Sequence, residues 1–170
     1  MRFPNDSFDA SIAYGGPLSY VFEKVEKAIS ELLRITKPGG VILLSVMSTL
    51  GTFQFFLESI VKDIDDFGLE IFQRAFDTGG VTGKLASGDH YCRMYRWGEL
   101  KSILNEYKCD ILEASACAYL SNSVYAEEVL KKVMENHEKW QALLKWEIEA
   151  CREPGIIDGG THMIVVLRVK

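Results

Sequence analysis

The segment that decides the fold lies at residues 31–44 and reads Glu31-Leu32-Leu33-Arg34-Ile35-Thr36-Lys37-Pro38-Gly39-Gly40-Val41-Ile42-Leu43-Leu44. Its first part completes a run from Val21 to Leu33 in which apolar residues recur every three or four positions, the pattern of an amphipathic helix. The proline cannot continue a helix, and the glycine pair permits a reversal of the chain. The apolar run Val41–Met47 that follows is typical of a strand covered on both faces. The segment therefore predicts a helix, a tight reversal and a buried strand.

Strand and helix patterns alternate along the rest of the chain. Short apolar runs predict strands at 8–14, 110–118 and 161–169, and apolar residues at helical spacing predict helices at 53–65, 97–107 and 126–151. The glycine-rich stretch 67–89 is expected to be a long loop with at most one short strand. This alternation predicts an α/β fold in which a mainly parallel sheet carries helices on both faces. The length of 170 residues fits a single domain, 1–170.

The composition is that of an ordinary soluble globular protein, with 48 % apolar and 25 % charged residues. A net charge of -5 and the lack of a dense Lys/Arg cluster disfavour a nucleic-acid partner, since phosphate binding needs a basic face. The apolar stretch 41–61 is interrupted by serines, threonines and a glutamate, which disfavours a membrane span. The first residues lack the pattern of a secretory signal, so we expect a cytoplasmic location.

Several other motifs point to no special chemistry. Residues 78–85 resemble a phosphate-binding loop, but the first and last of them are not the glycine and the Ser or Thr that this motif needs. The cysteines and histidines show no metal-ligand spacing, so we expect no metal site. The acidic run 63–66 lacks the spacing of a calcium loop and is interpreted as a solvated helix end. His137 and His162 are interpreted as structural residues.

Two segments could line a ligand site. The first follows a predicted strand and reads Tyr14-Gly15-Gly16-Pro17-Leu18-Ser19-Tyr20; its glycine pair would let a ligand come close to the backbone. In an open α/β sheet, ligands bind at the carboxyl ends of the strands. The second, residues 90–97, concentrates aromatic and basic side chains ahead of a helix, as in the lining of a small-substrate pocket. The alternative for the first segment is a plain tight turn. The alternative for the second is the start of a helix that aromatic packing holds in place.

Taken in order, these segments resemble the C-terminal portion of class I S-adenosylmethionine (SAM)-dependent methyltransferases. Residues 5–12 resemble the start of the family's fourth strand, 31–44 its next helix, Pro-Gly-Gly turn and fifth strand, 96–104 the helix before its sixth strand, and 161–170 its antiparallel seventh strand. The resemblance implies a partial Rossmann-like sheet with the spatial order fourth, fifth, seventh, sixth. Residues 108–110 depart from the family, which has a glycine and an aromatic residue there.

The resemblance also implies where cofactor and substrate lie. For SAM it implies Phe3 and Pro4 near the adenine, Tyr14, Gly15 and Gly16 at the methionine end, and Ser19 and Tyr20 at the junction with the substrate. For the substrate it implies Met47, Ser48, His90, Tyr91, Arg93 and Tyr95. His90 is the candidate general base, although methyl transfer needs chiefly the alignment of the acceptor with the methyl group. The inserted segment 119–160 is expected to form a lid or wall over the substrate.

The main departure from the family is at the start of the chain. The family carries a glycine-rich SAM loop after its first strand, and this sequence contains no G-x-G-x-x-G. The resemblance thus implies a fragment of a small-molecule methyltransferase, whose fourth strand lacks a neighbour. The alternative is a non-catalytic interaction module that pairs through this strand edge, for instance with a second copy. A third interpretation is a dehydrogenase-like nucleotide domain, but the antiparallel closing strand disfavours it.

Overall fold

The computed structural model describes residues 3–85, 88–122 and 126–170, with the side chains of 84–90 and of residue 126 left out. The helices and strands within these ranges follow one another as β1 (Phe8–Ala13), η1 (Pro17–Tyr20), η2 (Phe22–Lys24), α1 (Val25–Ile35), β2 (Thr36–Met47), α2 (Thr49–Phe55), α3 (Leu57–Phe67), α4 (Leu69–Thr78), β3 (Gly80–Leu85), β4 (Gly88–Arg93), α5 (Trp97–Asn105), β5 (Cys109–Cys117), α6 (Ala126–Met134), α7 (His137–Arg152) and β6 (His162–Val169). None of the helices in the described ranges is long and apolar enough to cross a membrane.

Four strands form the main sheet in the order β1-β2-β6-β5. β1 and β2 are parallel neighbours, with Ala10 opposite Val41 and Ala13 opposite Leu44. β6 runs antiparallel to both β2 and β5, so the other three strands share one direction. The predicted strand order and the antiparallel closing strand are therefore confirmed.

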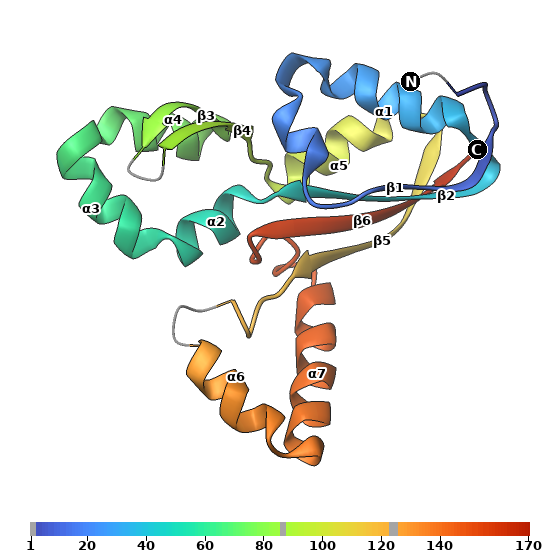
Figure 1. The fold of residues 1–170 in the computed structure, drawn as a ribbon. Coiled ribbons are helices and arrows are strands. Elements are labelled where there is room, and N and C mark those ends of the chain that lie inside the picture. The colour runs from blue at the N-terminus through green and yellow to red at the C-terminus, as the bar shows by residue number, and fades with distance from the viewer. Residues whose placement is uncertain (1–2, 86–87, 123–125) are drawn as a thin grey trace.

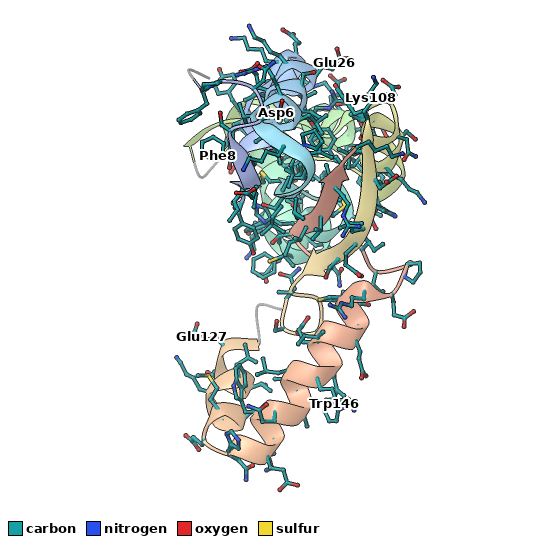
Figure 2. The ribbon with its side chains drawn as sticks, turned by 90° about the vertical axis from the view of Figure 1, so that its right-hand side faces the viewer. Asp6, Phe8, Glu26, Lys108, Glu127 and Trp146 are labelled. Carbon is teal, nitrogen blue, oxygen red and sulfur yellow. The ribbon has the colours of Figure 1, made fainter. Side chains whose placement is uncertain are left out.

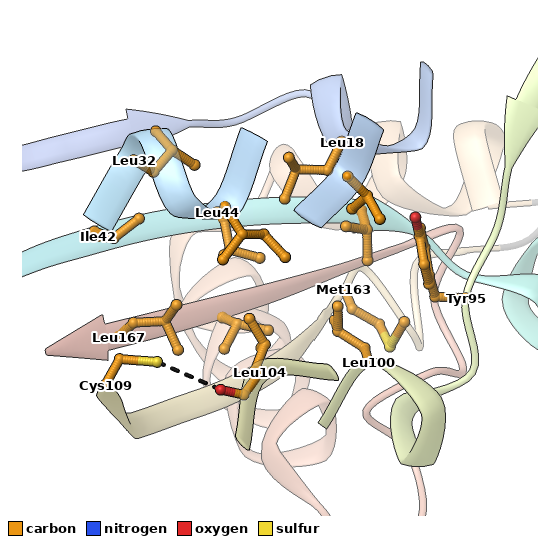
Figure 3. Close-up of a cluster of buried hydrophobic side chains, with 14 of the residues drawn as sticks. Leu18, Leu32, Ile42, Leu44, Tyr95, Leu100, Leu104, Cys109, Met163 and Leu167 are labelled. Atoms are coloured by element: carbon orange, nitrogen blue, oxygen red, sulfur yellow. Dashed lines mark hydrogen bonds between the residues drawn. The ribbon is translucent and has the colours of Figure 1, made fainter. Parts of the chain in front are cut away.

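Helices lie on both sides of this sheet. α1 and α5 cover one face, while α7 contacts β5 from the opposite side (Figure 1). Because successive side chains of a strand point to opposite faces, every second residue of β2 and β6 enters the core under α1 and α5. The fully buried members of this set are Ile42, Leu44, Val46, Met163, Val165 and Leu167 (Figure 3). The α/β architecture predicted from the alternating patterns is thus the one observed.

The expected long loop at 67–89 was wrong. Most of it forms the helix α4 and the antiparallel hairpin β3–β4, in which Val81 lies opposite Cys92. Gly68 and Gly79 have positive φ angles of 85° and 71° and flank α4, so these glycines end helices instead of marking a loop. Gly79 also lies against the backbone of Met94, where a Cβ would come within 2.0 Å of the carbonyl oxygen.

The single long helix expected at 126–151 is two helices, α6 and α7, joined at Asn136. The side-chain oxygen of Asn136 accepts a hydrogen bond from the N–H of Lys139 at 3.0 Å. An asparagine in this position starts a new helix, because it satisfies a backbone donor that the helix itself leaves free. The α6–α7 pair projects from one end of the molecule, with Trp146 58 % exposed (Figure 2).

Candidate functional site

The predicted diglycine loop lies where the carboxyl ends of β1 and β2 meet. The hydroxyl oxygen of Ser45, on β2, accepts hydrogen bonds from the backbone N–H groups of Gly15 (2.9 Å) and Gly16 (3.1 Å). The Ser19 hydroxyl oxygen accepts a third from the N–H of Met47 at 2.9 Å. Two serine side chains thus fix the loop to β2, and Ser19 is fully buried in this role.

The imidazole ring of His162 lies next to Gly16 of this loop. A Cβ on Gly16 would lie 3.3 Å from Nε2 of His162 and 3.7 Å from Cγ of Met47. His162 opens β6 and pairs in register with Met47, at the carboxyl end of β2. Burial lowers the pKa of the His162 imidazole, so the ring is mostly neutral at pH 7. The expected antiparallel pairing of 161–170 with 41–47 brings His162 to this end of β2, although the sequence alone indicated only a structural role for His162.

A cavity of about 280 Å³ opens beside the loop. Tyr20 and Met47 form its wall on the sheet side. The remaining lining comes from α2, α3, α4 and the β3–β4 hairpin, and consists of Thr52, Phe53, Phe56, Ser59, Ile60, Asp63, Ile71, Phe72, Ala75, Val81, Cys92 and Met94. Most of these side chains are apolar or aromatic, as in pockets that bind small organic molecules.

Among the described side chains of this lining, one face of α3 supplies the only charged group. Phe56, Ser59, Ile60 and Asp63 recur at intervals of three and four, so they lie on one side of the helix and face the cavity. The interpretation of residues 63–66 as a solvated helix end holds for Asp65 and Asp66, which are exposed, but not for Asp63, which is half-buried.

Of the substrate residues expected near β4, Tyr91 and Arg93 are not among the residues that line the cavity. Cys92 and Met94 line the cavity and are buried, whereas Tyr91 is 60 % exposed. The Arg93 guanidinium pairs with the carboxylate of Glu99 and lies 5.1 Å from the ring centroid of Tyr95, so it too points away from the cavity. Strand alternation therefore places Cys92 on the cavity side of β4 and Tyr91 and Arg93 on the other side.

Two further predicted substrate residues, Ser48 and Tyr95, form hydrogen bonds that fix the backbone near the end of β2. Ser48 is fully buried, and its hydroxyl donates to the carbonyl oxygen of Asp158 at 2.6 Å while it caps α2. Tyr95 is fully buried in the core, and its N–H donates to the carbonyl oxygen of Met47 at 2.9 Å. Both residues support the end of β2, and neither is among the residues that line the cavity.

The predicted residues Phe3 and Pro4 lie at the opposite end of β1 from the diglycine loop. The Phe3 ring packs edge-on against Phe8 at 5.1 Å, and its carbonyl oxygen accepts a hydrogen bond from Arg34. Six residues of strand, about 20 Å at 3.3 Å per residue, separate this end of β1 from Tyr14. The structure thus does not bring Phe3 and Pro4 together with the other cofactor residues, and their place near the adenine stays a prediction.

The structure does not test the roles predicted for His90 and for the segment 119–160. The backbone of His90 belongs to β4, opposite Gly83, but its side chain lies outside the described residues. The described residues of 119–160 contribute nothing to the lining of the cavity, which α3 and α4 cover instead. The role of His90 as a base and that of 119–160 as a lid remain predictions.

Solved structures of other proteins share this arrangement. No protein-family model and no curated protein sequence matches the chain. A SAM-dependent methyltransferase from Methanosarcina mazei superposes with a TM-score of 0.54 at 13 % identity, over 99 % of this chain and 62 % of that one. One from Thermotoga maritima, described as a possible histamine N-methyltransferase, gives 0.54 at 14 % identity, over 100 % and 60 %. A third, from Mesorhizobium loti, gives 0.50 at 13 % identity, over 99 % and 64 %.

The chain has the class I methyltransferase fold. These identities are too low to show more than the fold, and the chain spans between 60 % and 64 % of the length of these three methyltransferases. The four strands of the sheet correspond in order to the fourth, fifth, seventh and sixth strands of that fold, as the resemblance implied. The diglycine loop then stands at the carboxyl ends of strands four and five of the class I methyltransferase sheet.

The loop fits some parts of SAM and not others. The N–H groups of Gly15 and Gly16 already donate to Ser45, so neither is left to bind the carboxylate of a methionine moiety. A Cβ on Gly15 would meet nothing within 4 Å, and the rings of Tyr14 and Tyr20 are both more than half exposed beside it. Open space and tyrosine rings suit van der Waals and cation–π contact with a sulfonium-bearing molecule. The diglycine loop thus has open space and tyrosine rings that could contact such a molecule, but the backbone N–H groups of Gly15 and Gly16 are both already bonded to Ser45.

Proposed function

We propose that this chain forms the acceptor-binding part of a SAM-dependent methyltransferase that acts on a small molecule. One observation carries the proposal: Met47 lies next to Gly16 of the diglycine loop and, together with Tyr20 at the end of η1, also lines the apolar cavity. A methyl donor at the loop and an acceptor in the cavity would therefore meet at these two side chains. Class I methyltransferases among the structural neighbours support this assignment.

The residues of this chain would act chiefly by placing the acceptor. SAM, when bound, supplies an electrophilic methyl group on a sulfonium. The rigid end of β2, held by Ser19, and the aromatic walls of the cavity orient the acceptor toward the loop and exclude water from it. His162 lies against Gly16 and is mostly neutral at pH 7, so it is a second candidate beside His90 to accept a proton from the acceptor.

Calorimetry with SAM tests the cofactor assignment. Residues 1–170 contain no G-x-G-x-x-G motif, so we expect weak or undetectable binding to this chain alone. We expect micromolar binding when the chain is produced with any glycine-rich loop encoded in frame ahead of Met1. Micromolar affinity of residues 1–170 alone would mean that the cofactor contacts are misplaced. A stop codon directly upstream, combined with no SAM binding, would contradict the proposed function.

The exposed edge of β1 favours a second candidate, a non-catalytic interaction module. β1 ends the order of the described main sheet, with β2 as its only partner there, and Ile12 on it is 71 % exposed. An unpaired strand with an exposed apolar side chain is a template for pairing with another chain, including a second copy. Sedimentation equilibrium tests this candidate, and a clean monomer across the micromolar range would remove self-pairing. A cytoplasmic location stays a prediction for either function.

A further inference from the structure

The carboxylate of Asp63 is the unusual feature of the apolar cavity. It is half-buried and is the single charged group among the fourteen residues that line the space. No lysine or arginine in the described ranges forms an ion pair with it, although nearby Lys62 pairs with Glu58 at 2.6 Å on the solvent side of α3. An unpartnered carboxylate at an apolar wall can pair with a cationic group of a ligand, and it would lose water without compensation if a ligand that lacks such a group covered it.

The aromatic side chains of the same cavity favour the same charge. Tyr20, Phe53, Phe56 and Phe72 line it, and the faces of such rings attract cations. The chain carries a net charge of -5, so its field also attracts cations and repels anions. The carboxylate, the aromatic lining and the overall charge thus all favour a cationic ligand.

From these contacts we infer that the cavity binds apolar molecules bearing a positively charged amine, and that Asp63 pairs with the amine. The apolar body of such a molecule would replace water against Phe53, Phe56 and Phe72. The inference rests on the proposed function only in treating the cavity as the acceptor site, because binding of the amine itself needs no SAM.

Other ligand classes fit the lining less well. An anionic ligand would lie near Asp63 and aromatic ring faces with no cationic side chain among the lining residues to balance it. A neutral apolar ligand would fill the space but leave the carboxylate with neither water nor a partner. Cationic, neutral and anionic ligands should therefore differ in affinity, and the carboxylate of Asp63 should determine the difference.

Matched indole probes separate these classes by isothermal calorimetry of residues 1–170. Tryptamine carries the ammonium, tryptophol has a hydroxyl in its place, and indole-3-acetate carries a carboxylate. We expect tryptamine to bind about tenfold more tightly than tryptophol, the scale of one hydrogen bond to a charged group. We expect no detectable binding of indole-3-acetate.

Asp63→Asn keeps the shape of the side chain and should abolish the preference for tryptamine over tryptophol. The control is Asp65→Asn, which removes the same charge from an exposed position two residues along α3 and should keep the preference. Equal binding of tryptamine and tryptophol, a preference that survives Asp63→Asn, or no binding of any probe would each overturn the inference. A chain that prefers tryptamine but never binds SAM, even with in-frame upstream residues, would contradict the proposed function and leave this inference standing.

Discussion

The hydroxyl of Ser45 accepts a hydrogen bond from the backbone N–H of Gly16 at 3.1 Å and ties the diglycine loop to the neighbouring strand. The same oxygen accepts the N–H of Gly15 at 2.9 Å, and Ser45 is 1 % exposed. This one side chain therefore satisfies two donors at the carboxyl ends of β1 and β2. The loop conformation that would face the methyl donor depends on it.

Ser45→Ala should lower the free energy of unfolding by about 1–3 kcal/mol, because it leaves the buried Gly16 N–H without its acceptor. Urea unfolding followed by circular dichroism measures this difference. Ser102→Ala is the control, since the Ser102 hydroxyl is exposed and only bonds back to Gly98 within α5. A loss for Ser45→Ala no larger than that for Ser102→Ala would show that the hydroxyl does not hold the loop.

Gly51→Ala should be strongly destabilising, because Gly51 lies against the turn before β6. A Cβ built on Gly51 would come within 1.8 Å of the carbonyl oxygen of Gly160, and its N–H donates to the carbonyl oxygen of Asp158 at 3.0 Å. Relieving the clash would move α2 or the turn, at a cost of about 3 kcal/mol or more in the free energy of unfolding. Thermal and urea unfolding both measure this loss.

Gly98→Ala is the matched change in open space. Gly98 lies in α5, and a Cβ there would meet nothing within 4 Å. Alanine favours a helix more than glycine does, so this variant should be more stable by up to about 1 kcal/mol. The clash account would be wrong if both alanine variants changed stability in the same direction and by similar amounts.

The sequence predicted the sheet because its strands carry strong local signals. The apolar run at 41–47 and the apolar centre of 161–169 each have one simple interpretation, and their pairing follows from the fold they resemble. The reversal predicted at 38–40 instead lies within β2, where the register with β1 is irregular. The bounds of two further strands also matched, since β1 and β5 begin and end within one residue of the predicted positions.

The sequence could not predict the cavity, for two physical reasons. Glycines Gly68 and Gly79 indicated a loop, whereas here each ends a helix, so α4 and its cavity residues were missed. In the six-residue strand β4, Cys92 and Tyr91 are neighbours whose side chains point to opposite faces. The local sequence does not indicate which of the two faces is buried. Apolar residues Ile71, Phe72 and Ala75 at helical spacing were the signal that could have revealed α4.

Acid should loosen the attachment of the α6–α7 pair through Glu147. Its carboxylate accepts the backbone N–H groups of Tyr119, Leu120 (3.0 Å) and Ser121 (2.8 Å). Burial acts to raise the pKa of Glu147, but these donors, together with the Cys151 thiol, hold the pKa below its usual value. A lowered pKa stabilises the fold above the unfolded-state pKa of about 4.3, and this contribution disappears as the pH falls through the folded-state pKa.

Urea unfolding between pH 7 and pH 3 measures this contribution. Glu147→Gln should reduce the free energy of unfolding at pH 7 by about 1–2 kcal/mol and flatten its decline in acid. Glu149→Gln changes an exposed glutamate on the same helix, whose only ion pair among the described residues is a 3.9 Å contact with Lys145. An acid decline as steep in Glu147→Gln as in Glu149→Gln would mean that the three N–H donors do not depend on the charge of Glu147.

The four cysteines should differ in reactivity according to burial. Burial raises the pKa of the Cys92 and Cys109 thiols, and burial with a hydrogen bond to Glu147 raises the pKa of Cys151 to about 12. Only a thiolate reacts readily with iodoacetamide, so these three should label slowly at pH 8. Cys117 is half-buried at the carboxyl end of β5 and should label first, as read by peptide mass spectrometry. Glu147→Gln should speed labelling of Cys151 alone, and equal acceleration at Cys109 would indicate general unfolding instead.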